Sequence, residues 1–171
     1  ASFVSFAGPK RFYAPPLSLK DLPPLDAILL SHDHYDHLDR TTVQQLAAAS
    51  AIHPVQWVCP LGVGRYLELW GVSRQRITEL NWGQTASVSE ELHITATPAR
   101  HFSGRNLWGR NETLWSSVGL RGNRHNLFFG ANSGFFPGFR QIGDAYGPFD
   151  LTLLEIGAYD ADWPDIHMGP V

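Results

Sequence analysis

Residues 27–37 of the chain read AILLSHDHYDH, and this stretch determines what the rest of the sequence is expected to form. Its first four residues are a continuous apolar run, which is typical of a buried β-strand. Its last six follow the pattern H-x-H-x-D-H, so three imidazoles and a carboxylate offer ligands that suit zinc, iron or manganese. In an extended turn His32 and His34 project to one side, and Asp36 and His37 can serve a neighbouring position. Ligands of α/β proteins gather at the carboxyl ends of strands, so we predict a metal site here rather than a solvated polar loop.

The composition excludes several classes of protein. Charged residues make up 17% of the 171 residues, below the roughly 25% of an average soluble protein, and 43% are hydrophobic, so the chain is too apolar to be disordered. A net charge of −3 argues against a broad nucleic-acid-binding face, and we expect no nucleic-acid partner. The single cysteine, Cys59, excludes an internal disulfide framework and a cysteine-rich zinc module. We find neither a signal peptide nor an apolar run of the roughly 18–20 residues that a membrane span needs, so we expect no transmembrane segment and a cytoplasmic location.

The order of the expected elements indicates an α/β fold in one domain. A helix capped by Asp39 or Thr41 follows the first strand and runs to Ala49, and a second helix ends before Gly71. Short strands separated by turns come next, and the turn at residues 121–124 indicates a hairpin. We expect strands at residues 27–30, 55–59, 76–80, 85–88, 92–96, 114–120, 125–129 and, as a buried strand, 151–156. The second helix is expected at 61–70 and a third at 138–146.

Several blocks of the sequence together resemble one known family. The pattern H-x-H-x-D-H after an apolar strand is the first-ligand signature of the metallo-β-lactamase fold superfamily. The decapeptide LSHDHYDHLD at 30–39 resembles the branch that contains N-acylphosphatidylethanolamine phospholipase D and its bacterial metal-dependent hydrolase relatives. TPARHFSGR at 97–105 and NETLWSS at 111–117 resemble later blocks of that branch, and residues 150–168, with IGAY and IHM, resemble its last ligand block. The resemblance implies an αββα sandwich of two sheets.

The resemblance also implies a function. Two zinc ions would be bound, with iron or manganese as alternatives, and a metal-bound hydroxide would attack a phosphodiester or related ester in a small-molecule or lipid substrate. Asp36 is the best candidate to orient that hydroxide, which makes it the expected catalytic residue. The ligands implied for the first metal are His32, His34 and His101, and those implied for the second are Asp36, His37 and His167.

One position departs from the family pattern. In the family an aspartate in a block of the type G-D-S/T-G bridges the two metals, whereas residues 128–135 read FFGANSGF here, and Asn132 takes its place. An amide offers one neutral carbonyl oxygen and cannot bridge as a carboxylate does. We therefore expect weaker metal binding at this position and reduced activity. Two alternatives stay open, namely a catalytically silent relative that binds a ligand, and a hydrolase that uses only the metal at His32, His34 and His101.

Basic residues lie close to His101 in the sequence. Arg100, Arg105 and Arg110 could recognise a phosphate, because the guanidinium fork matches its oxygens. The alternative is a solvated loop with salt bridges. Arg105 is the residue that we predict to bind substrate.

The length of the chain bears on the fold. All the ligand blocks fall within residues 1–171, yet the resemblance implies strands before Ala1 and a helix and a strand after His167. We therefore expect an incomplete sandwich, which either a further segment or a partner completes, or which self-associates through open sheet edges.

Overall fold

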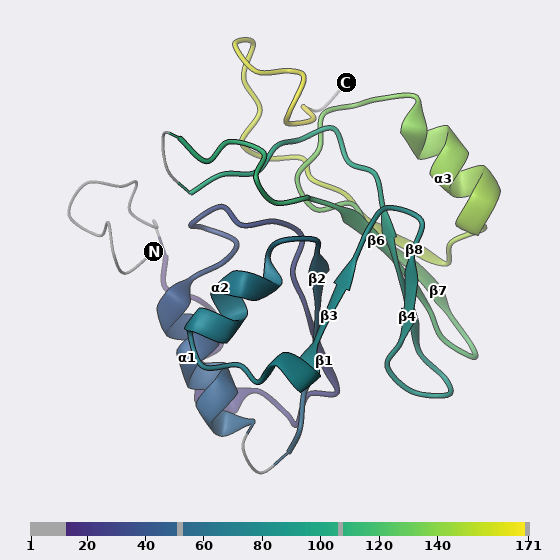
Figure 1. Ribbon diagram of the computed structural model, residues 1–171. Coiled ribbons are helices and arrows are strands. Elements are labelled where there is room, and N and C mark those ends of the chain that lie inside the picture. Colours follow the sequence, from purple (N-terminus) through teal and green to yellow (C-terminus); the bar gives the residue numbers. More distant parts are fainter. Residues whose placement is uncertain (1–12, 51–52, 106–107, 170–171) are drawn as a thin grey trace.

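The computed structural model describes residues 13–50, 53–105 and 108–169, which fold into two β-sheets with helices on both outer faces (Figure 1). The three-stranded sheet has the order β1-β2-β3, and the five-stranded sheet has the order β4-β5-β6-β7-β8. Helices α1 and α2 cover the first sheet and helix α3 covers the second, so the expected αββα sandwich is confirmed. None of the described helices has the length and apolar character needed to cross a bilayer.

The first sheet is parallel and consists of β1 (Ala27–Leu29), β2 (Gln56–Pro60) and β3 (Ile77–Leu80). Alternate residues of a strand point to opposite faces, and β2 uses both faces. Trp57 and Cys59 pack toward α1 (Arg40–Ala49) and α2 (Gly64–Leu69), while Val58 packs against the other sheet. A strand buried on both faces needs the continuous apolar run that the sequence shows.

The second sheet consists of β4 (Thr85–Ser87), β5 (His93–Thr97), β6 (Ser117–Arg121), β7 (Asn126–Phe129) and β8 (Leu151–Leu153). Neighbouring strands are antiparallel up to β7, and β8 pairs parallel with β7. Strands β5 and β7 are both antiparallel to β6, and β8 is parallel to β7, so the carboxyl ends of β5, β7 and β8 all lie at the same end of the sheet. Helix α3 (Gly138–Tyr146) packs Phe139 edge-on against Phe128 on the outer face.

Two expected elements begin three residues later than predicted. The helix expected at 61–70 starts at Gly64, because Gly62 has a φ of +85° and sits in the turn before it. The strand expected at 114–120 starts at Ser117, because the Leu114 N–H donates to the carbonyl of Leu61 instead of to a neighbouring strand. The second difference comes from a long-range contact, which propensity does not encode.

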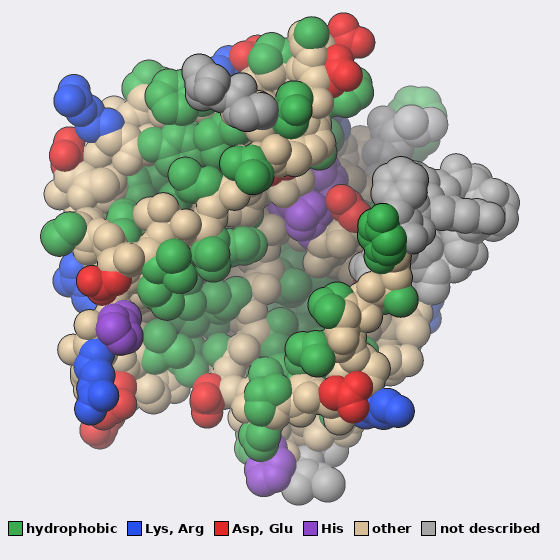
Figure 2. Space-filling model, turned by 180° about the vertical axis from the view of Figure 1, so that it is seen from behind, with side chains coloured by type: hydrophobic (Ala, Val, Ile, Leu, Met, Phe, Trp, Pro, Cys, Tyr) green, Lys and Arg blue, Asp and Glu red, His purple; other side chains and the backbone are tan. Residues whose placement is uncertain are grey.

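The strand expected to be buried at 151–156 is shorter and exposed. It ends at Leu153, and Leu151, Leu153 and Ile156 are 50%, 53% and 75% exposed. The reason is that β8 is the outer strand of its sheet, while the facing sheet ends at β1. Figure 2 shows hydrophobic side chains over much of this side of the molecule. The assignment of residues 1–171 to a single domain stays a prediction, because residues at both ends lie outside the described part.

Candidate metal centre

Three histidines from two strand ends converge on one point. His32 and His34 follow β1, and His101 follows β5. His32 Nε2 lies 3.0 Å from His34 Nδ1, and His101 Nε2 lies 3.3 Å from the same atom. One nitrogen of each ring lies within 4.8 Å of the others, and no other three His, Cys, Asp or Glu side chains of the described chain meet in this way.

This donor set fits a metal ion of the zinc type. Ligand nitrogens on a tetrahedral zinc, at about 2.0–2.1 Å from it, lie roughly 3.3 Å from one another. The separations of 3.0 and 3.3 Å that join His34 Nδ1 to the other two rings are close to this value. Three imidazoles leave the fourth corner open, as in catalytic rather than structural zinc sites.

The second ring nitrogens of His32 and His101 are held by hydrogen bonds, and burial favours the neutral form of all three imidazoles. His32 Nδ1 lies 2.9 Å from Ser31 Oγ, and His101 Nδ1 donates to the carbonyl of Ile166 at 3.0 Å. Such contacts orient a ligating histidine. Burial lowers the pKa of His32 to about 2 and that of His101 to about 4, and burial also lowers the pKa of His34. The lone pairs that a metal needs are thus free at neutral pH.

The residues expected at the second metal lie beside this group in a looser arrangement. His37 Nε2 lies 3.3 Å from Asp36 Oδ2 and 3.1 Å from Asn132 Nδ2, so the structure brings these three side chains together. The hydrogen bond with His37 holds the pKa of Asp36 below its usual range. His167 stands apart from them, with its ring packed edge-on against His101 at 5.2 Å between centroids.

Glu155 is a residue of the site that the sequence analysis missed. It follows β8, is largely buried, and lies with Oε1 2.5 Å from His167 Nδ1. Its Oε2 accepts a hydrogen bond from the backbone N–H of Ser133 at 3.1 Å. Its position just past a strand end, like that of the ligands, is the signal that could have revealed it.

The two loops that carry the three histidines are fastened to each other. The N–H of Gly104 donates to Asp33 Oδ1 at 2.7 Å, and the Arg105 guanidinium donates to the carbonyls of Asp33 and Leu38 at 2.6 and 2.8 Å. The same guanidinium stacks 4.1 Å from the centroid of the Tyr35 ring. Arg105 is thus engaged with the first ligand loop, and its contact with substrate stays a prediction.

The other two arginines also contact the protein itself. Arg100 forms an ion pair with Asp165 at 2.6 Å and donates to the carbonyl of Phe135 at 3.1 Å. It therefore links the loop after β7 to the segment before His167. The Arg110 guanidinium lies 4.7 Å from the centroid of the Phe102 ring.

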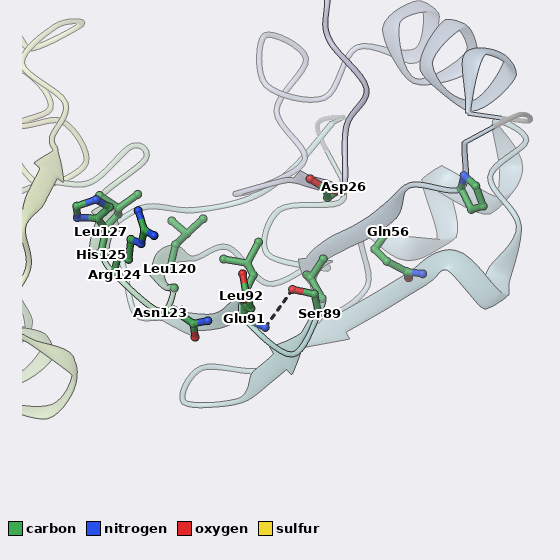
Figure 3. Close-up of a pocket in the computed structure, with 13 residues that line it drawn as sticks. Asp26, Gln56, Ser89, Glu91, Leu92, Leu120, Asn123, Arg124, His125 and Leu127 are labelled. Atoms are coloured by element: carbon green, nitrogen blue, oxygen red, sulfur yellow. Dashed lines mark hydrogen bonds between the residues drawn. The ribbon is translucent and has the colours of Figure 1, made fainter.

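A hollow of about 860 Å³ lies at the other end of the strands (Figure 3). It borders the residue before β1 and the turns between β4 and β5 and between β6 and β7, whereas the histidines follow the carboxyl ends of β1 and β5. It is therefore separate from the metal centre. Its polar lining includes Asp26, Gln56, Glu91, Arg124 and His125.

Comparisons with known proteins agree with this geometry. The family model for the beta-lactamase superfamily domain matches residues 2–171. An uncharacterized protein of Mycobacterium tuberculosis (strain H37Rv) is 52% identical over 163 residues, covering 95% of this chain and 42% of its own length. The N-acyl-phosphatidylethanolamine-hydrolyzing phospholipase D 1 of Caenorhabditis elegans is 39% identical over 171 residues, covering 95% of this chain and 47% of its own length. The chain thus spans less than half the length of these relatives.

A solved structure shares the fold. Igni18, a metallo hydrolase of the archaeon Ignicoccus hospitalis, superposes with a TM-score of 0.65 at 20% identity, over 88% of this chain and 57% of the other. The sandwich, the histidine cluster after β1 and β5, and the match to the family model over nearly the whole chain agree with one another. The chain belongs to the beta-lactamase superfamily.

Proposed function

We propose that this chain hydrolyses phosphodiester bonds in the manner of a phospholipase D, with zinc held at two adjacent positions. The observation that carries the proposal is the convergence of His32, His34 and His101, in which the Nε2 atoms of His32 and His101 both lie within hydrogen-bonding distance of His34 Nδ1. The name of the Caenorhabditis elegans relative supports the phosphodiester class, and an N-acylated phospholipid is the substrate that we propose first.

The expected ligands form two groups, one for each metal position. The three neutral histidines would hold the first zinc, and Asp36, His37, Asn132 and His167 would hold the second. When bound, the metals would supply an activated water and stabilise the charge of the leaving oxygen. Asp36 stays ionised because of its hydrogen bond with His37, so it can accept a hydrogen bond from the attacking water and orient it.

Asn132 supports a competing proposal. Its amide lies 3.1 Å from His37 Nε2, where a carboxylate would attract a second cation more strongly. A silent relative would hold little metal and turn over no ester. A hydrolase with one metal would use only the compact group of three histidines.

Metal content and turnover together distinguish these functions. The purified chain is analysed for zinc, iron and manganese, and is assayed with bis(p-nitrophenyl) phosphate and with an N-acylphosphatidylethanolamine. We expect two zinc ions, turnover of both substrates, and loss of activity in His101→Ala but not in the exposed control His125→Ala.

The other outcomes contradict the proposal in different ways. A stoichiometry of one, with activity lost in His101→Ala and kept in His167→Ala, establishes the hydrolase with one metal. An absence of metal and turnover that Asn132→Asp does not reverse establishes the silent relative. Turnover of the small ester alone rejects the lipid substrate.

A further inference from the structure

Glu155 connects two parts of the second metal position. Its two carboxylate oxygens contact different segments, with Oε1 on His167 Nδ1 at 2.5 Å and Oε2 on the N–H of Ser133 at 3.1 Å. Ser133 is fully buried and directly follows Asn132. One side chain therefore holds both the histidine and the loop that carries the asparagine.

The first contact determines which nitrogen of His167 is available. An ionised carboxylate can only accept, so the proton of the His167 ring must sit on Nδ1. Nε2 then carries the free lone pair that can bind a metal, and its ring packs against His101. A carboxylate behind a histidine fixes its tautomer and raises its basicity toward a metal.

Glu155 also affects the charge at the second metal position. Among the four side chains expected at the second metal, Asp36 is the one carboxylate, since Asn132 is neutral and the other two are imidazoles. Glu155 is itself shielded from water, with 11% of its side chain exposed, so its charge is felt strongly by its neighbours. In the described part of the chain, the one ion pair of Glu155 is the one with His167.

We propose that Glu155 is a positioning residue of the second metal position, which fixes His167 and Asn132 and supplies through His167 the negative charge that Asn132 lacks. This inference rests on the proposed function, because it concerns the same metal pair. It extends that function by explaining how a site with a neutral amide can still bind a second cation.

Zinc binding tests the assignment without any assay of activity. Zinc per chain and chelator competition are measured for the wild type, for Glu155→Gln, and for Glu91→Gln, an exposed control at the opposite end of the sandwich. We expect Glu155→Gln to keep the first zinc and to bind the second about 10–100-fold more weakly, as is usual when a residue behind a ligand is lost. Adding Asn132→Asp to Glu155→Gln should restore the second zinc, because it returns the missing charge.

A second measurement needs no metal. In the metal-free wild type, ¹⁵N NMR of the histidine rings should show His167 protonated on Nδ1, and Glu155→Leu, which leaves no acceptor there, should lose this preference while His93, far from the site, is unchanged. Circular dichroism confirms that the variant is folded.

The outcomes separate the two proposals. A Glu155→Gln chain that binds two zinc ions with wild-type affinity, or a Glu155→Leu chain that keeps the Nδ1 tautomer, overturns the role of Glu155 alone. A second zinc that Asn132→Asp fails to restore overturns the charge argument. A wild type that binds fewer than two zinc ions contradicts the proposed function and the metal role of Glu155 with it, whereas the tautomer still decides whether Glu155 orients His167.

Discussion

Arg105 illustrates how a single side chain near a metal loop can act on the loop itself. Its guanidinium donates to the carbonyls of Asp33 and Leu38 and stacks on Tyr35, so its hydrogen bonds and its flat face are both engaged by the first ligand loop. Burial lowers its pKa, although the side chain remains a cation at neutral pH. Its contacts favour a role in holding the loop, beside the predicted role in binding substrate.

Replacing Arg105 with methionine distinguishes these roles. Methionine keeps the length of the side chain and removes the charge and the hydrogen bonds. If Arg105 holds the loop, the free energy of unfolding should fall by about 3 kcal/mol or more, since two hydrogen bonds from a charged group are lost and each is worth about 1.5–3 kcal/mol. Zinc affinity should fall with it, which urea unfolding and chelator competition measure.

The control is Arg124→Met, at an exposed turn far from the site, which should leave both quantities unchanged. A rise in KM for a charged phosphodiester, with stability and zinc affinity unaltered, would instead establish that Arg105 binds substrate.

At the scale of elements, the site depends on close contact between loops that follow different strands. Gly134, in the loop after β7, lies against the segment before His167. Its N–H also donates to the carbonyl of Arg100, in the loop after β5. A Cβ at Gly134 would overlap the backbone carbonyl of Asp165. The absence of a side chain therefore allows the segments that carry Asn132 and His167 to approach each other.

Gly134→Ala should push these segments apart. We expect a loss of about 1–3 kcal/mol in the free energy of unfolding, as for other overpacked sites, together with weaker binding of the second zinc. Thermal unfolding and zinc titration measure the two effects.

The matched control is Gly143→Ala in α3, because nothing lies within 4 Å of a Cβ at that position. Alanine in a helix should stabilise the chain by roughly 0.5–1 kcal/mol there. Equal effects of the two substitutions would contradict the close approach at Gly134.

The same division between local and distant contacts explains what the sequence could predict. The strand before the histidines, the Asp39 cap of α1 and the hairpin between β6 and β7 depend on neighbouring residues, and all three are confirmed. The gathering of His32, His34 and His101 came from family resemblance, because the residues alone do not show that loops 67 positions apart will meet.

The contacts of Glu155 and Arg105 could not be predicted from the sequence. An acid after an apolar run gives no sign of a partner twelve residues away, on a segment without regular structure. An arginine near a ligand suggests phosphate binding, while the carbonyls that it contacts belong to a loop about seventy positions earlier. The exposure of β8 likewise depends on how far the opposite sheet extends.

At the scale of the whole molecule, the two sheets differ in width. Three strands face five, so the inner face of the larger sheet passes from buried residues such as Ile94 on β5 to Phe129 on β7 and Leu153 on β8, which are 38% and 53% exposed. An uncovered apolar face of this kind is a surface on which other chain segments can pack. Self-association through the open edges stays a prediction.

The metal centre also influences the stability of the whole fold through pH. In the metal-free chain, burial lowers the pKa of His32 to about 2, whereas the same imidazole titrates near 6.5 in the unfolded chain. Between these values the unfolded chain binds more protons than the folded one, so the free energy of unfolding rises with pH. Lowering the pH from 7 to 5 should therefore cost about 2 kcal/mol from His32 alone, with a further loss from His101, whose pKa burial lowers to about 4.

Urea unfolding in the presence of a chelator measures this dependence. His32→Gln should flatten it, while His125→Gln, at an exposed turn, should leave it unchanged. An identical slope in the wild type and in His32→Gln would show that the buried imidazole does not set the pH response. Zinc should raise the free energy of unfolding by a similar amount at each pH between 5 and 7, because His32 and His101 are already neutral in the folded site and lose no proton when the metal binds. A difference in slope between the zinc-bound and the metal-free chain would therefore report titrating groups other than these two.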